Sequence, residues 1–322
     1  MVAFIRKIVA YHVAQQEMLR GRTSGGRCWE ARPAEHRLPQ GSRVYPASYG
    51  ATRGSGMADG AGNAITGSES GASAGGGDVR RSPRSNLLIT PELALTGYDI
   101  GDLGDDLTSP ALVAEAAAVA KEVGIGLIVG VAQREEPGGV TWNAAVAIDR
   151  AGMVCATYRK IHLFGGLDRS RFAPGPTPPT VVDIDGLRVG MLICYDIEFP
   201  EGARALALAG ADLIGIPTAN MTPWLAVNEH IVPTRAVENQ VYVAYANHIG
   251  REGDTHYLGA SVIAGPDGST HRANATDEAI VVTTIDLDDL ARRRVESPYL
   301  ADRRPQLYHS LVADSAVPEE DS

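Results

Sequence analysis

Hydrophobic positions divide the chain into two parts that meet near residue 86. Beyond that point, short apolar runs bounded by Gly, Pro or Asp alternate with longer segments in which apolar residues recur at helical spacing. The apolar runs predict strands at residues 87–89, 125–131, 144–149, 153–158, 181–184, 188–194, 213–217, 241–246, 261–264 and 279–285. The helical pattern covers residues 109–123, 201–209, 228–239 and 286–295.

The character of these strands indicates how they are covered. Many are apolar throughout, which is typical of strands buried on both faces. The pair on either side of Asp185-Gly186 is close enough to form a hairpin, so a purely parallel sheet is not expected. The pattern predicts a layered α/β domain with mixed sheets over residues 86–311.

The first part of the chain, residues 1–85, lacks sustained periodicity. It is rich in Gly, Ala, Ser and Arg, most clearly over residues 54–77. Such a composition buries too little apolar surface to offset the entropy lost on ordering the chain. We expect disorder there, apart from a short helix near residues 3–19, and a loose acidic tail over residues 312–322.

Composition and charge narrow the classes of partner. The 322 residues are 44% hydrophobic and 21% charged, with a formal net charge of −10, which disfavours nucleic acid as a partner. We find no apolar run long enough for a bilayer, no signal-peptide order of charges and no metal-ligand spacing, so no membrane partner, metal or other cofactor is expected. Three cysteines, Cys28, Cys155 and Cys194, are too few for a disulfide framework and indicate a cytoplasmic protein.

Three residues stand where predicted strands end. Cys194 follows an apolar strand and precedes a helix, and ligand crevices of α/β sheets lie at such strand ends. The alternative is a small buried thiol, as most free cysteines are. Glu92 follows the run 87–91, and Lys160 precedes the apolar segment 161–164; each alone is more typical of a solvated charge. A nucleophilic thiol needs a base and an oxyanion donor, which this pair could supply.

The sequence around these residues resembles the nitrilase superfamily of carbon–nitrogen hydrolases, in its amidase-like branch. Pro91-Glu92-Leu93-Ala94-Leu95-Thr96-Gly97-Tyr98 is similar to the first family signature. Tyr158-Arg159-Lys160-Ile161-His162-Leu163-Phe164 resembles the second, and Leu192-Ile193-Cys194-Tyr195-Asp196-Ile197-Glu198-Phe199-Pro200-Glu201 the third. The resemblance extends over about residues 86–310. It implies a four-layer α-β-β-α sandwich and association into a homodimer or larger homo-oligomer.

The resemblance also implies roles for individual residues. Cys194 is the nucleophile that forms a thioester, Glu92 the acid and base, and Lys160 with the Tyr195 backbone N–H the oxyanion site. Asp168 stands eight positions after Lys160, where the family has a glutamate that orients substrate and catalytic groups. The predicted substrate-binding residues are Tyr98, Tyr195, Ala219 and Asn220. His162 and His248 are interpreted as structural or rim residues rather than additional bases.

The implied reaction is hydrolysis of a small amide to a carboxylic acid and ammonia. Three related activities remain open, namely those of a nitrilase, an N-carbamoyl hydrolase and an acyltransferase. A rival of another class is a catalytically inactive interaction protein.

The N-terminal part departs from the family, which opens with a strand and a long helix before the glutamate signature. We find neither in residues 1–85. Either the segment is a disordered extension that replaces this unit, or it is a mistranslated reading frame. The second hypothesis agrees better with the Arg, Gly, Ala, Ser and Pro bias. In that case a core strand would be missing and a sheet edge exposed.

Overall fold

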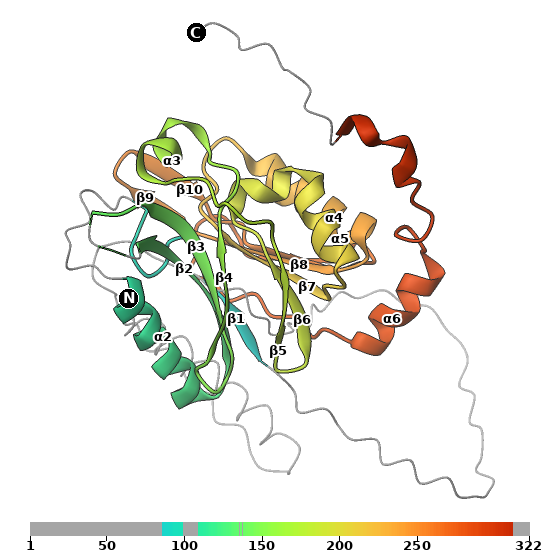
Figure 1. Cartoon of the computed structure of the whole chain (residues 1–322), viewed down its shortest axis with the longest axis horizontal. Coiled ribbons are helices and arrows are strands. Elements are labelled where there is room, and N and C mark those ends of the chain that lie inside the picture. The colour runs from blue at the N-terminus through green and yellow to red at the C-terminus, as the bar shows by residue number, and fades with distance from the viewer. Residues whose placement is uncertain (1–85, 99–108, 135, 137, 312–322) are drawn as a thin grey trace, which may run out of the picture.

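The computed structural model describes residues 86–98, 109–134, 136 and 138–311. The predictions for residues 1–85 and 312–322 concern parts of the chain outside this range. Two large β-sheets with helices packed on them, together with a two-stranded sheet, make up most of the described part (Figure 1).

The first sheet carries the N-terminal described strands in the order β1-β2-β3-β4. β1 runs parallel to β2, and the other neighbours are antiparallel. The strands are β1 (Leu87–Ile89), β2 (Gly126–Arg134), β3 (Thr141–Ile148) and β4 (Val154–Arg159). Nearly all of β2 and β3 is buried, as expected from their apolar runs.

The second sheet has six strands in the order β12-β11-β8-β7-β6-β5. Its centre, β6-β7-β8, is parallel, whereas β5 forms a hairpin with β6, and β11 is antiparallel to both its neighbours. The strands are β5 (Val181–Ile184), β6 (Leu187–Met191), β7 (Leu213–Thr218), β8 (Tyr242–Asn247), β11 (Val262–Ala264) and β12 (Thr270–Arg272). A separate hairpin joins β9 (Ile249–Glu252) to β10 (Thr255–Leu258).

The two sheets pack face to face. A Cβ added at Gly215 of β7 would lie 2.6 Å from the side chain of Ile128 on β2 and 3.1 Å from that of Ile89 on β1. Helix α2 packs its Ala116, Val119 and Ala120 on the first sheet, while α4 and α5 cover the second (Figure 1). The helices are α2 (Ser109–Val123), α3 (Gly165–Arg171), α4 (Pro200–Leu208), α5 (Val232–Asn239) and α6 (Leu287–Glu296). This arrangement confirms the α-β-β-α sandwich.

The predicted elements agree with the structure except in a few places. The strand expected at residues 279–285 is wrong, because Val281 and Ile285 pack on the core from a segment that joins no sheet, and β12 takes the sheet edge instead. The hairpin β9-β10 and the helix α3 were not predicted. The helix expected at 228–239 begins as a π-helix, Val227–Ile231, before α5.

Gly130 of β2 lets the turn after β1 lie directly on the sheet. Leu95 N donates to Gly130 O at 3.0 Å, and a Cβ at Gly130 would lie 2.6 Å from Pro91 O. We expect Gly130→Ala to lower the free energy of unfolding by about 1–3 kcal/mol, because backbone atoms must move to admit the methyl group. Urea unfolding measures this effect. The control is Gly166→Ala, where a Cβ meets nothing within 4 Å; equal losses in both variants would contradict the prediction.

Candidate active site

Glu92, Lys160 and Cys194 come from three strand ends that meet between the sheets. Glu92 follows β1, Lys160 directly follows β4, and Cys194 lies three residues beyond the end of β6. Lys160 Nζ donates to Glu92 Oε1 at 2.7 Å, and the charges of both residues act on the Cys194 thiol. The structure therefore brings together the three residues that the sequence singled out.

Lys160 binds two carboxylates in a fully buried cluster. Its Nζ is 2.7 Å from Glu92 Oε1 and 2.7 Å from Asp168 Oδ2, and all three side chains are inaccessible to solvent. Burial disfavours the charged amine, but Glu92, Cys194 and Asp168 outweigh it and raise the pKa of Lys160 above its ordinary value. Lys160 is therefore a cation held in place between two buried carboxylates.

Asp168 is held from three sides. Its Oδ2 accepts from Lys160 and from the Phe164 backbone N–H at 2.9 Å, while its Oδ1 accepts from the hydroxyl of Tyr98. The residue lies in α3, whose short turn brings the carboxylate back toward the end of β4. An aspartate at this position thus reaches Lys160 without the additional methylene of a glutamate.

The two oxygens of Glu92 have different surroundings. Oε1 accepts from Lys160 and from Asn143 Nδ2 at 2.6 Å, whereas Oε2 is buried and has no hydrogen bond within the described residues. Burial raises the pKa of the Glu92 carboxyl, and Lys160 opposes this rise. Glu92 Oε2 is thus the oxygen available for proton transfer.

Cys194 occupies a turn that its neighbours hold in place. Its φ of 45° lies in the left-handed region, which non-glycine residues seldom adopt, and it opens a 3-10 helix, Cys194–Glu198. Burial raises the pKa of the Cys194 thiol and Glu92 raises it further, while Lys160 and the Ala219 backbone N–H oppose them. The resting group is therefore a thiol, which needs a base before it can attack.

Asp196 connects this turn to the segment that carries Lys160. Its Oδ2 accepts from the Ile193 N–H at 3.1 Å and from the Tyr158 hydroxyl at 2.8 Å. Its Oδ1 accepts from the His162 backbone N–H at 2.9 Å and lies 2.8 Å from His162 Nδ1. The carboxylate is buried, so these contacts fix the nucleophile turn against the end of β4.

The carbon-nitrogen hydrolase family model matches residues 55–295. The chain belongs to this family. The matched range begins ahead of residue 86, where the sequence pattern placed the start of the folded domain.

Relatives and solved structures place this carbon-nitrogen hydrolase in the amidase-like branch of the nitrilase superfamily. The "Hydrolase in pqqF 5'region" of Pseudomonas protegens is 44% identical over 70% of this chain and 81% of its own length. The (R)-stereoselective amidase of a Pseudomonas species is 34% identical over 69% and 81%. An amidase from Nesterenkonia sp. AN1, solved with butyramide, is 32% identical over 70% and 83%, with a TM-score of 0.62.

Another structure of the same amidase bears on the chemistry. Its variant with glutamine in place of a glutamate carries the acetamide moiety of fluoroacetamide covalently on the active-site cysteine (TM-score 0.60, 33% identity, 70% of this chain and 83% of that one). The family and these amidases identify the present chain as an amide-hydrolysing enzyme.

The residues predicted to bind substrate differ in what they contact in this hydrolase. Ala219 hydrogen-bonds Cys194 through its backbone, and Tyr195 follows the nucleophile. Tyr98 is buried, and its hydroxyl donates to Asp168, which gives it a supporting position. The Asn220 amide donates to Trp224 O at 3.0 Å and to Asn228 Oδ1 at 2.7 Å, so it holds its own loop.

Sequence reasoning missed Asn143, which donates directly to Glu92. An amide inside the buried apolar strand β3 is the signal that could have found it. His248 Nε2 lies 2.6 Å from the Glu92 backbone oxygen, and the His162 ring stacks on Phe199 at 3.8 Å, so both histidines hold other groups in place.

Neither a metal centre nor a membrane span emerges from the described part of the chain. It contains no group of three or more His, Cys, Asp or Glu side chains arranged to hold a metal ion. None of its helices is both long and apolar enough to cross a bilayer.

Proposed function

We propose that this enzyme hydrolyses a small amide to a carboxylic acid and ammonia through a thioester on Cys194. The observation that carries the proposal is the buried cluster at the strand ends. The thiol of Cys194, a Glu92 carboxylate with one oxygen free of hydrogen bonds, and the Lys160 cation meet there. These are the nucleophile, base and oxyanion donor that acyl transfer requires.

The first half-reaction makes the thioester. Glu92 Oε2 takes the proton of the Cys194 thiol as Sγ attacks the amide carbon. Lys160 Nζ and the Tyr195 backbone N–H stabilise the negative oxygen that forms; the N–H groups in the first turn of a helix have no partner within it. When the carbon–nitrogen bond breaks, Glu92 returns the proton to nitrogen and ammonia leaves.

The second half-reaction releases the acid. Glu92 Oε2 takes a proton from water as the water oxygen attacks the thioester carbon. The carbon–sulfur bond then breaks, and the proton passes from Glu92 to Cys194 Sγ. Asp168 keeps Lys160 charged and in place throughout, because it binds the second of the amine's donors at 2.7 Å.

An amide is favoured over the alternative substrates. The Tyr195-Asp196 pair after the nucleophile resembles amidases rather than nitrilases, and the Nesterenkonia structures hold small amides. A nitrilase, an N-carbamoyl hydrolase and an acyltransferase would use the same residues but different substrates or products. In a catalytically inactive interaction protein, nothing would compensate for the cost of burying the charges of Glu92, Lys160 and Asp168.

The test is ammonia release from a panel of small aliphatic amides, nitriles and N-carbamoyl compounds, with intact-protein mass spectrometry on each mixture. We expect turnover of amides and a transient mass increase that maps to Cys194. Absence of both ammonia and acylated Cys194 with every compound, from a folded preparation, would show that the proposal is wrong.

Two further proposals concern the setting of the enzyme. A homodimer or larger homo-oligomer follows from the family resemblance, and sedimentation velocity tests it. A cytoplasmic location follows from the small number of cysteines, and fractionation of cells that express the full chain tests it.

A further inference from the structure

Glu198 ends the 3-10 helix that Cys194 begins, and its backbone is firmly anchored. Arg235 Nη2 donates to the Glu198 carbonyl at 2.8 Å, and Arg235 Nε donates to the Ile197 carbonyl at 3.1 Å. The guanidinium is further occupied by Glu238 at 3.1 Å. Arg235 thus fixes where the Glu198 side chain starts without pairing with its carboxylate.

The Glu198 carboxylate is half-buried and has neither a hydrogen bond nor an ion pair within the described residues. Burial raises the pKa of its carboxyl, and the cation that opposes this rise is Lys160 rather than Arg235. Its charge also acts on the hydroxyl of Tyr245, which is buried beside Cys194. The charged groups that act together with the Glu198 carboxylate thus belong to the buried site around Cys194.

Aromatic rings border the same region. In a 3-10 helix residues three apart lie on one face, so Glu198 shares a face with Tyr195. The Tyr195 ring meets Phe164 at 5.2 Å, and Phe164 meets Trp224 at 6.4 Å, both edge to face. Trp224 is half-exposed, which leaves part of this aromatic wall open. An open carboxylate beside aromatic rings is a combination that binds ammonium groups.

We propose that Glu198 and this aromatic wall form a subsite for an ammonium group on the acyl chain of the substrate. The inference rests on the proposed amidase function and specifies its substrate class as small amino-substituted amides. A half-buried carboxylate without a partner is costly, and a substrate ammonium would pair with it. The Glu198 carboxylate would repel a substrate whose acyl chain carries a carboxylate.

Butyramide and β-alaninamide test this subsite because they differ only by a methyl group and an ammonium group at the same position. Calorimetry on the Cys194→Ala protein measures both affinities without turnover. In that background we expect Glu198→Gln to lower the ratio of β-alaninamide to butyramide affinity about tenfold, the value of one charged hydrogen bond. With Cys194 intact, Glu198→Gln should lower the ratio of kcat/KM for β-alaninamide to kcat/KM for butyramide by a similar factor.

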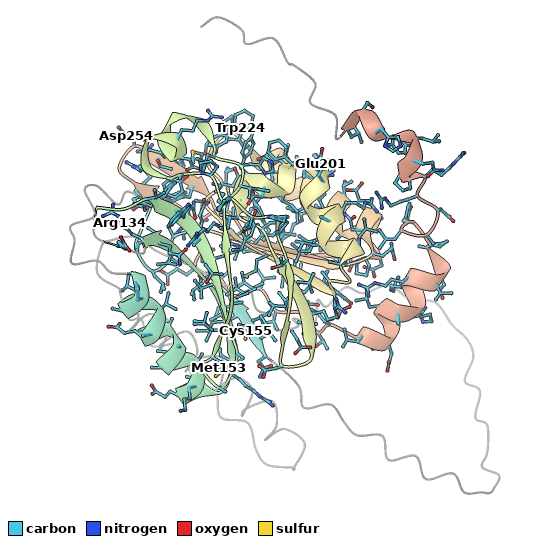
Figure 2. The ribbon with its side chains drawn as sticks, viewed as in Figure 1. Arg134, Met153, Cys155, Glu201, Trp224 and Asp254 are labelled. Atoms are coloured by element: carbon cyan, nitrogen blue, oxygen red, sulfur yellow. The ribbon has the colours of Figure 1, made fainter. Side chains whose placement is uncertain are left out.

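Glu201→Gln is the matched control. It removes the same charge three residues away at an exposed position on α4, labelled in Figure 2, and we expect an unchanged ratio. The subsite proposal is wrong if Glu198→Gln changes the ratio of β-alaninamide to butyramide affinity by less than twofold. It is also wrong if Glu198→Gln and Glu201→Gln lower this ratio equally. If the proposed amidase function is wrong, no amide is turned over and Cys194 is not acylated. The affinity ratio measured on the Cys194→Ala protein still tests the role of Glu198 in that case.

Discussion

The Lys160→Met variant is expected to lose about 3–5 kcal/mol of folding free energy at pH 7, and its kcat/KM at least about a thousandfold. Removing the amine leaves Glu92 and Asp168 as buried carboxylates without their shared cation. Without Lys160, which opposes the effect of burial, the pKa of the Glu92 carboxyl rises further in the folded state. Urea unfolding and amide turnover measure the two effects.

This loss of stability should depend on pH. A carboxyl whose folded-state pKa is raised favours folding at low pH, and that contribution is lost as the pH rises through its folded pKa. The difference between Lys160→Met and the wild type should therefore shrink as the pH falls toward the ordinary glutamate value of 4.5. Lys121→Met, which removes an exposed lysine on α2, is the control. A deficit that is independent of pH, or that the control shares, would contradict the interpretation.

The Cys194→Ala variant should lose at least about ten-thousandfold in kcat/KM while it stays folded, because no other group described at the site can form the thioester. The substitution also removes the only atom whose attack makes ammonia release possible in the proposed mechanism. Continuous ammonia detection and intact-protein mass spectrometry record the loss of turnover and of acylation together.

Cys155→Ala is the matched control for this experiment. Cys155 is the other described free cysteine, and it lies toward the opposite end of the molecule from Trp224 (Figure 2). Its Sγ donates to the Met153 carbonyl at 3.5 Å, and the charges that act on its thiol are those of Asp149, Asp185 and Asp183. We expect normal activity from this variant. Residual turnover in Cys194→Ala above the level of contaminating wild type would assign the nucleophile elsewhere.

Much of the site could be predicted because its principal residues stand at strand ends. Apolar runs that stop at Glu92 and Cys194, and a predicted strand that ends just before Lys160, are visible in the sequence alone. The carboxyl ends of strands gather at one edge of a sheet. Asp168 was found from its distance to Lys160 in the family signature. Its support from Tyr98, 70 residues earlier, needed the folded chain.

Other features depend on contacts that no local pattern encodes. Asn143 is 51 residues from Glu92 in sequence, and nothing in β3 indicates which group its amide meets. Residues 279–282 form an apolar run like that of a strand, but such a run records burial and not strand pairing. Val281 accordingly packs on the core without joining a sheet. The hairpin β9-β10 was missed because its short strands are largely polar and partly exposed.

The unequal surroundings of the two Glu92 oxygens have a consequence for the order of events. Oε1 is occupied by Lys160 and Asn143, so in the proposed mechanism a single oxygen serves the thiol, the departing ammonia and the incoming water in turn. The thiol, the ammonia and the water therefore occupy the position next to Glu92 Oε2 one after another. In this mechanism water reaches that position only after ammonia has left it. Small nucleophilic amines that reach this place before water would intercept the thioester, so added hydroxylamine should divert product to the hydroxamate.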